Sequence, residues 1–277
     1  MADTAHHRTL ALDATLLLSI PLLLAAIHFL ATTALQQALV FDHTRFNGYT
    51  LLTAAYVHAS NTHLFSNLLG YGLTATYTYS LCLHVDERQW FRRTLPLHLI
   101  ALPVLVSLTS YAIFQFRYPS ADPVSRGFSG VVGGLGGFLL VALYVFVKKR
   151  HDGELAWAVG LTVFLLLMQL IDLRYVGGFR ASVTGLVLLG GVLTFGQYAR
   201  RGVEVPDGED RRDAVITAGA VGLVGAVLGV LILGLFPSAK TLVEGETFTN
   251  VFAHAAGFII GVANSTVIRV VYNAQKR

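Results

Sequence analysis

The fold is decided by the stretch Gly127-Phe128-Ser129-Gly130-Val131-Val132-Gly133-Gly134-Leu135-Gly136-Gly137-Phe138, which opens a hydrophobic segment that continues to Val147. A helix needs about 20 predominantly apolar residues to cross a bilayer, and this segment has that length. Its glycines leave the hydroxyl of Ser129 uncovered and allow other helices to approach closely. The sequence therefore places a candidate nucleophile at the head of a membrane-crossing helix.

The composition of the whole chain is that of an integral membrane protein. Hydrophobic residues make up 54% of the 277 residues and charged residues only 13%, with a mean hydropathy of +0.62. The net charge of +4 comes from basic residues in short clusters between apolar runs, which is typical of membrane orientation. We therefore expect the lipid bilayer as a partner and no nucleic acid. Cys82 is the only cysteine, which excludes an intramolecular disulfide and a cysteine metal cage.

Eight apolar segments predict an all-α, polytopic transmembrane helix bundle. They cover approximately Leu12–Leu35, Thr62–Leu83, Leu95–Phe116, Phe128–Val147, Leu155–Leu173, Ala181–Tyr198, Ala214–Phe236 and Asn250–Val270. The first segment is longer than the core of a secretory signal, so we interpret it as a retained helix. No second domain is evident, and residues 1–277 are expected to form a single membrane domain.

The distribution of Lys and Arg predicts the orientation of these segments. If the N-terminus is cytoplasmic, 14 of the basic residues fall on the cytoplasmic side and 6 on the opposite side. Because Lys and Arg are enriched in cytoplasmic loops, we expect a multi-pass protein of the cell membrane with both termini in the cytoplasm. The second, fourth and eighth segments then begin on the outer side, with His63, Asn67, Ser129 and His254 in their first turns.

Two connections stand out between the apolar segments. Residues 36–61 carry aromatic and aliphatic side chains among polar ones. We expect this connection to contain short helical pieces that lie partly in the headgroup region, with an ordinary ordered loop as the alternative. Residues 200–213 are the one stretch that looks soluble, and they are interpreted as a cytoplasmic turn between the sixth and seventh apolar segments.

Ser129 needs a base before its hydroxyl becomes a useful nucleophile. At the N-terminus of a helix, free backbone N–H groups and the positive end of the helix dipole stabilise nearby negative charge, including an oxyanion formed by attack on a carbonyl. The alternative is a serine that only caps the helix or packs between glycines.

His254 is the candidate base. An ionisable ring inside an apolar helix faces the protein interior or a water-filled cavity, because exposure to lipid is costly. Gly257 and Gly261 form a G-x-x-x-G face that allows close packing against the glycine-rich helix of Ser129. Such packing would bring the imidazole beside Ser129, where it would act as general base and then as general acid. A histidine satisfied by a backbone carbonyl or by water is the alternative.

His63 and Asn67 are four residues apart and therefore share one face of the second helix. Both donate hydrogen bonds without being charged, which suits stabilisation of an oxyanion, although a polar helix-packing pair is the alternative. His58 is expected to organise the end of the preceding loop. A zinc site formed by His58, His63 and His254 is a rival interpretation. Because no carboxylate or H-E-x-x-H pattern accompanies these histidines, we expect neither a metal nor another cofactor.

Three short motifs occur together in the chain: His63-Leu64-Phe65-Ser66-Asn67, Gly127-Phe128-Ser129-Gly130, and Ala253-His254-Ala255-Ala256-Gly257 followed by Gly261. They resemble the H-x-x-x-N, G-x-S-G and A-H-x-x-G-x-x-x-G motifs of rhomboid intramembrane serine proteases, in the order of that family. The resemblance covers the first four apolar segments and the last one. It implies a rhomboid-like core within a bundle of about eight transmembrane helices.

The resemblance also implies an activity. It suggests a serine endopeptidase that cleaves transmembrane protein substrates near the outer membrane face with a serine and histidine dyad and no catalytic aspartate. Carried over by position, Ser129 is the nucleophile and His254 the base. His63, Asn67 and the backbone N–H of Ser129 line the oxyanion hole. An alternative from another class is a catalytically inactive rhomboid-like protein that binds membrane clients; a small transporter is a third.

The sequence departs from the family pattern at three places. Three apolar segments separate the serine helix from the histidine helix where the family usually has one, so a pair of helices within about residues 151–212 is interpreted as an insertion at the periphery. Gly133 stands where the family often has a tyrosine that packs on the catalytic histidine. The Trp-Arg pair common in the family's first outer loop is not evident in residues 46–52. We expect the helix that ends at Phe236 to be the lateral gate.

Overall fold

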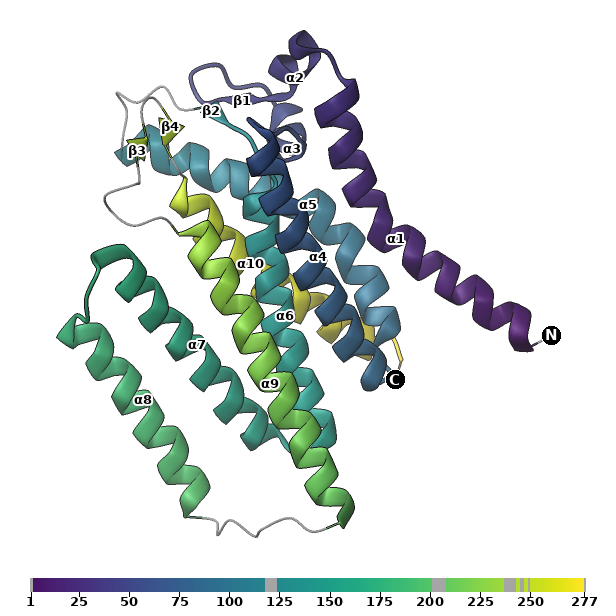
Figure 1. The fold of residues 1–277 in the computed structure, drawn as a ribbon, viewed down its shortest axis with the longest axis vertical. Coiled ribbons are helices and arrows are strands. Elements are labelled where there is room, and N and C mark those ends of the chain that lie inside the picture. The colour runs from purple at the N-terminus through teal and green to yellow at the C-terminus, as the bar shows by residue number, and fades with distance from the viewer. Residues whose placement is uncertain are drawn as a thin grey trace.

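The computed structural model describes residues 2–117, 124–200, 208–236, 243–244, 247–248 and 250–276, and it is an all-α helical bundle (Figure 1). The predicted fold class is confirmed at this level. The long helices of the described residues are α1 (Ala2–Leu30), α4 (Asn61–His84), α5 (Arg88–Arg117), α6 (Ser129–Arg150), α7 (Gly153–Val176), α8 (Ala181–Ala199), α9 (Gly208–Leu235) and α10 (Val251–Ala274).

Six helices within the described residues are long and apolar enough to cross a membrane, which is consistent with a membrane protein. They are Thr9–Leu30, Arg88–Phe116, Ser129–Arg150, Gly153–Val176, Arg211–Leu235 and Val251–Ala274. The helix of Ala181–Thr194 is apolar but shorter. The helix α4 is less apolar, because it contains His63, Asn67 and several threonines. Eight crossings therefore stay a prediction.

The helix α6 lies in the middle of the bundle, and 83% of its most apolar stretch is buried inside the protein. It packs against α4, α5, α7, α9 and α10. Its large side chains, such as Phe138 and Phe146, are almost fully buried in the main hydrophobic core. Burial on all sides explains why the sequence of α6 is apolar around its whole circumference.

The pair of α6 and α10 is the most extensive helix contact in the described residues. A Cβ atom added to Gly257 would overlap the carbonyl oxygen of Gly130, and one added to Gly261 would overlap that of Gly134. The backbone of α6 thus occupies the space that side chains at Gly257 and Gly261 of α10 would need, which is the close packing that small residues allow. The predicted packing of the Gly257 and Gly261 face against the serine helix is confirmed.

The first turns of α4, α6 and α10 lie at the same end of the bundle (Figure 1). At the other end, buried carboxylates hold the helices together through ion pairs. Asp13 of α1 pairs with Arg92 of α5 at 2.5 Å, and Glu87 pairs with Lys149 of α6 at 3.0 Å and with Arg269 of α10 at 3.1 Å. Both carboxylates are at least 95% buried, so pairing is what makes their burial tolerable.

The helices α7 and α8 lie at the edge of the bundle (Figure 1). α7 packs against α6 and α9, whereas α8 packs mainly against α7. The turn between them is closed by Gly177 with a φ of +76° and by an ion pair between Asp172 and Arg180. The predicted insertion within residues 151–212 therefore does not separate α6 from α10.

The connection between α1 and α4 contains the predicted short helical pieces, α2 (Thr33–Leu39), α3 (Thr50–Thr53) and the 3-10 turn η1 (Ala54–Tyr56). The first apolar segment was predicted to continue to Leu35, but α1 ends at Leu30 because Thr32 caps the N-terminus of α2. The placement of this connection in the headgroup region stays a prediction.

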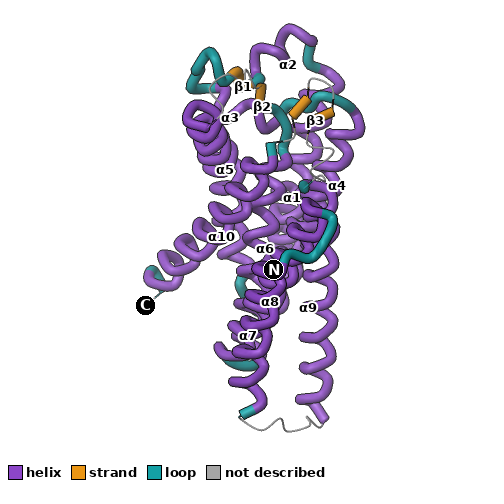
Figure 2. Tube along the Cα trace, turned by 90° about the vertical axis from the view of Figure 1, so that its left-hand side faces the viewer, coloured by secondary structure: helices purple, strands orange, loops and turns teal. Residues whose placement is uncertain are grey.

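Within the described ranges, four strands of two residues each occur that were not predicted. β1 (Phe41–Asp42) pairs antiparallel with β2 (Val124–Ser125), and β3 (Val243–Glu244) pairs antiparallel with β4 (Thr247–Phe248). The side view in Figure 2 shows β1, β2 and β3 gathered with α2 and α3 at one end of the molecule. The pairing of β1 with β2 ties the segment that precedes Ser129 to the connection between α1 and α4.

Candidate active site

Ser129 is the first residue of α6, and the turn before it is held from several directions. Gly127 has a φ of +114°, which favours glycine, and its N–H donates to the carbonyl of Ala54 at 3.0 Å. Phe128 is fully buried, with its ring 5.6 Å from that of Tyr56 and 6.1 Å from that of Tyr71. These contacts fix the direction in which the Ser129 hydroxyl leaves the helix.

The N-terminus of α6 carries no side-chain cap, because its N-cap residue is Phe128, whose side chain has no acceptor. A helix leaves its first N–H groups without intrahelical partners. The N–H of Phe128 donates to His58, whereas the N–H groups from Ser129 onward lie beside the Ser129 hydroxyl without an intrahelical acceptor, together with the positive end of the helix dipole. Such an arrangement favours a developing negative charge on a bound carbonyl oxygen.

The hydroxyl oxygen of Ser129 lies 2.9 Å from Nε2 of His254, which is within hydrogen-bond distance. His254 is on the first turn of α10 and only 6% exposed. The contact joins positions 125 residues apart in the sequence. It was predicted from the glycine pattern of the two helices, and the predicted distance range of about 2.6–3.2 Å includes the observed value.

The other ring nitrogen of His254, Nδ1, lies 2.5 Å from the backbone carbonyl of Leu235 at the end of α9. A carbonyl oxygen only accepts hydrogen bonds, so Nδ1 carries the proton in this contact. In the neutral ring the second nitrogen is then an acceptor. Nε2 is therefore the acceptor for the Ser129 hydroxyl proton, which is the arrangement that a general base requires.

The close approach of α6 and α10 at Gly133 excludes a larger residue at this position. A Cβ atom on Gly133 would lie 2.7 Å from the backbone oxygen of His254, which is closer than real Cβ contacts. The backbones of α6 and α10 thus leave no space for an aromatic side chain here. The ring of Phe236, which follows the last residue of α9, instead meets the ring of His254 edge to face, with the centroids 5.9 Å apart.

His63 lies beside the turn that precedes Ser129, and Asn67 follows it by one turn of α4. The His63 ring fills the space next to Gly127, where an added Cβ would be 2.6 Å from Nε2. The Asn67 side chain is 3% exposed, and its Nδ2 donates to the carbonyl of His63 at 3.0 Å. One amide hydrogen is therefore used within α4, while the group carries a second. The structure thus brings His63 next to the serine turn and orients Asn67 along its own helix.

His58 organises the end of the loop, as expected from the sequence. Its Nε2 accepts the backbone N–H of Phe128 at 3.4 Å, and the residue is 3% exposed. Burial, followed by the neighbouring His63 and His28, lowers the pKa of His58 to about 3. The ring is therefore neutral near pH 7 and able to accept this hydrogen bond.

The zinc site considered for His58, His63 and His254 would require their nitrogens to converge. Instead, Nε2 of His58 accepts a hydrogen bond from the backbone N–H of Phe128, and Nε2 of His254 lies within hydrogen-bond distance of the Ser129 hydroxyl. Across the described segments, no group of three or more His, Cys, Asp or Glu side chains is arranged to hold a metal ion.

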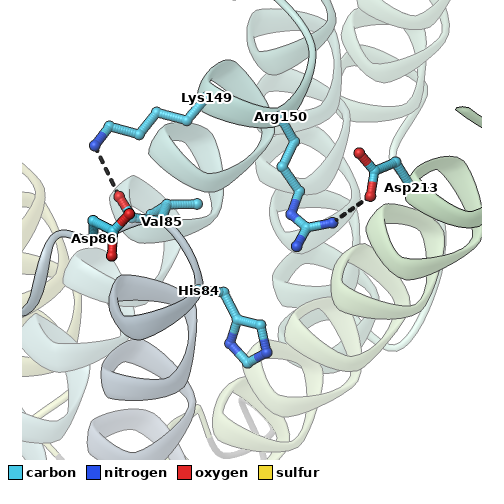
Figure 3. A pocket seen from close by; sticks show the side chains of 6 residues that line it. All are labelled: His84, Val85, Asp86, Lys149, Arg150 and Asp213. Carbon is cyan, nitrogen blue, oxygen red and sulfur yellow. Dashed lines mark hydrogen bonds and ion pairs between the residues drawn. The ribbon is translucent and has the colours of Figure 1, made fainter. Parts of the chain in front are cut away.

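A pocket of about 420 Å³ lies at the opposite end of α6 (Figure 3). It is lined by His84, Val85, Asp86, Lys149, Arg150 and Asp213. Figure 3 shows that its basic groups are engaged: Lys149 donates to the carbonyl of Val85 at 2.8 Å, and Arg150 pairs with Asp213 at 2.7 Å. The lining contains neither a serine nor a cysteine, so this pocket offers no hydroxyl or thiol nucleophile.

The comparisons with known proteins identify no relative. No family model, curated protein or solved structure matches the chain. A function therefore has to be inferred from the three sequence motifs and from the arrangement of Ser129, His254, His63 and Asn67.

Proposed function

We propose that the chain is an intramembrane serine endopeptidase of the rhomboid type, which cleaves transmembrane protein substrates near the outer membrane face. The observation that carries the proposal is the 2.9 Å contact between the Ser129 hydroxyl and Nε2 of His254. Two residues that are 125 positions apart and carry complementary chemistry meet at the ends of two apolar helices. A serine that only capped its helix would not need this histidine.

The proposed reaction begins when Ser129 Oγ attacks a peptide carbonyl of the substrate and its proton moves to Nε2 of His254. The imidazolium then gives this proton to the leaving amine as the C–N bond breaks, and an acyl ester remains on Ser129. A water molecule, deprotonated by His254, hydrolyses the ester and restores the hydroxyl. The substrate helix has to unwind locally, because a helical peptide bond is shielded from attack.

The oxyanion of the tetrahedral intermediate would be stabilised at the N-terminus of α6. The backbone N–H of Ser129 and the ring of His63 are the donors that the geometry favours, because both lie at the turn formed by Gly127 and Phe128. Asn67 contributes through its second amide hydrogen. A small rotation of its side chain would release the bond to the His63 carbonyl and provide a further donor.

In the proposed membrane arrangement, all long helices cross the bilayer and both termini are cytoplasmic. The excess of basic residues at the end of the bundle opposite Ser129 supports this orientation. The dyad would then lie below the outer surface, reached by water from outside. α9 is the proposed lateral gate for substrate, and α7 and α8 form a peripheral addition to a rhomboid-like core.

The proposal is tested by cleavage of a model transmembrane substrate in lipid vesicles that contain the purified protein. Ser129→Ala and His254→Ala are each expected to reduce cleavage by a factor of roughly 10³ or more while the protein remains folded, as thermal unfolding will show. Ser66→Ala is the matched control, because Ser66 is exposed on α4 and bonds only within its helix. Cleavage at the wild-type rate by either dyad variant would rule out this mechanism. A folded wild-type protein that cleaves no substrate would favour the inactive, client-binding alternative.

A further inference from the structure

We infer that the C-terminal end of α9 is the positioning element for His254, with the Leu235 carbonyl and the Phe236 ring acting together. This inference rests on the proposed function, since it assigns the group that orients the catalytic base. It identifies Phe236 as a positioning residue outside the three sequence motifs. It also makes the competence of the base depend on the docking of α9.

The first part of the argument is the hydrogen bond of Nδ1. In serine hydrolases a third group usually holds the ring of the base in the correct tautomer and orientation. Here Nδ1 of His254 lies 2.5 Å from the carbonyl of Leu235. Leu235 is the last residue of α9, and Phe236 follows it. A backbone carbonyl thus takes the place that a carboxylate has in a triad. It fixes the proton on Nδ1 and leaves Nε2 to accept from Ser129.

The second part is the aromatic contact. The rings of Phe236 and His254 meet at an interplanar angle of 78° with their centroids 5.9 Å apart. The backbone N–H of Phe236 donates to the carbonyl of Ile232 at 2.9 Å, so the last turn of α9 sets the position of this ring. α6 offers no aromatic side chain here, because Gly133 lies against the backbone of His254. The support for the ring therefore comes from α9.

The third part is how α9 is held in place. Its buried residues Leu228 and Leu231 pack against α6, with methyl groups 3.4 Å from the position of a Cβ atom on Gly136. Leu231 also approaches Gly70 of α4. The position of the C-terminal end of α9 thus depends on the packing of Leu228 and Leu231. A displacement of this helix would remove the acceptor of His254 Nδ1 and the contact between the two rings together.

The test measures the tautomer of His254 directly. The full-length protein is labelled with [15N]histidine, and the His254 signals are identified by their loss in His254→Gln. We expect the proton on Nδ1 in the wild type and a mixture of tautomers in Phe236→Ala. Leu233→Ala is the matched control, because this side chain is on the last turn of α9 but 51% exposed, and it should keep the wild-type tautomer. A wild-type ring protonated on Nε2 would overturn the inference.

Kinetics supply the second readout. Phe236→Ala is expected to lower kcat by roughly 10-fold to 100-fold through misorientation of the base. KM should change less than kcat, because the lost contact is with the base, while α9 keeps its packing against α6. Phe236→Leu keeps an apolar side chain but removes the ring. It replaces Phe236→Ala if the alanine variant folds poorly, and its kcat should lie between those of the wild type and Phe236→Ala. Equal kcat values and equal tautomers in Phe236→Ala and Leu233→Ala would contradict a positioning role.

The two proposals fail in distinguishable ways. If the wild type cleaves nothing but carries the proton on Nδ1 and loses this preference in Phe236→Ala, the positioning by α9 stands and the protease function fails. If the wild type cleaves substrate but its tautomer and kcat are insensitive to Phe236, the function stands and the positioning fails.

Discussion

The backbone oxygen of His254 lies 2.7 Å from the point where a Cβ atom on Gly133 would stand. We predict that Gly133→Ala forces α6 and α10 apart and destabilises the protein by about 1–3 kcal/mol, as overpacking does. Cleavage should fall as well, because the same movement separates Ser129 from His254. Thermal unfolding in detergent and the vesicle assay measure both effects.

Gly72→Ala is the control for this prediction. Gly72 is on α4, and a Cβ atom added there meets nothing within 4 Å. Alanine is expected to stabilise the helix by roughly 0.5–1 kcal/mol, because glycine is a poor helix former. A Gly133→Ala variant as stable and as active as Gly72→Ala would show that the two helices are not packed this closely.

Acid is expected to weaken the turn before Ser129 through His58. Burial lowers the pKa of His58 to about 3, below the ordinary value of 6.5, so the unfolded chain binds the extra proton first. This contribution to stability is complete above about pH 6.5 and declines as the pH falls toward 3. The melting temperature of the wild type should therefore drop between about pH 7 and pH 5, and less steeply in His58→Gln. Parallel curves for the two proteins would contradict this role.

His98 of α5 is expected to be a site where an apolar residue stabilises the protein. Its side chain is fully buried, and within the described residues neither ring nitrogen has a hydrogen-bond partner. Burial of an unpaired polar group costs about 1–3 kcal/mol. His98→Leu should therefore raise the melting temperature, whereas His84→Leu on the exposed end of α4 should not. A lower melting temperature for His98→Leu would indicate a bound partner for this ring.

The peripheral position of α7 and α8 predicts that damage to their turn spares the dyad. Asp172 is 2% exposed and accepts hydrogen bonds from the side chain and the backbone N–H of Arg180. Asp172→Asn should lower the melting temperature by an amount equivalent to about 1 kcal/mol, since the Arg180 side chain is largely exposed. Cleavage should stay within about twofold of the wild type. A large loss of activity would mean that these helices support Ser129 or His254.

The contact between Ser129 and His254 could be predicted from the sequence because its cause is a pattern of side chains. Gly257 and Gly261 recur four residues apart, and the helix of Ser129 is rich in glycine, so close packing of the two helices was the expected result. The length of the apolar segments likewise predicted the long helices. The end of α1 was missed because the capping residue Thr32 lies inside a continuous apolar run.

The orientation of His254 could not be predicted, because its partner is a backbone carbonyl. Every residue has this group, so Leu235 carries no signal in the sequence. The same limit applies to β1 and β2, whose two-residue pairing depends on where distant segments meet. The bond from Asn67 to the His63 carbonyl follows from the side-chain rotamer, which the spacing on α4 does not specify.

The most direct measurement of the central claim is covalent labelling of the purified, folded protein with a fluorophosphonate probe, which reacts with an activated serine. We predict that the wild type and Ser66→Ala are labelled, that Ser129→Ala is not, and that His254→Ala is labelled much more slowly. Absence of labelling in the wild type, or equal labelling of Ser129→Ala, would contradict the claim that His254 activates Ser129.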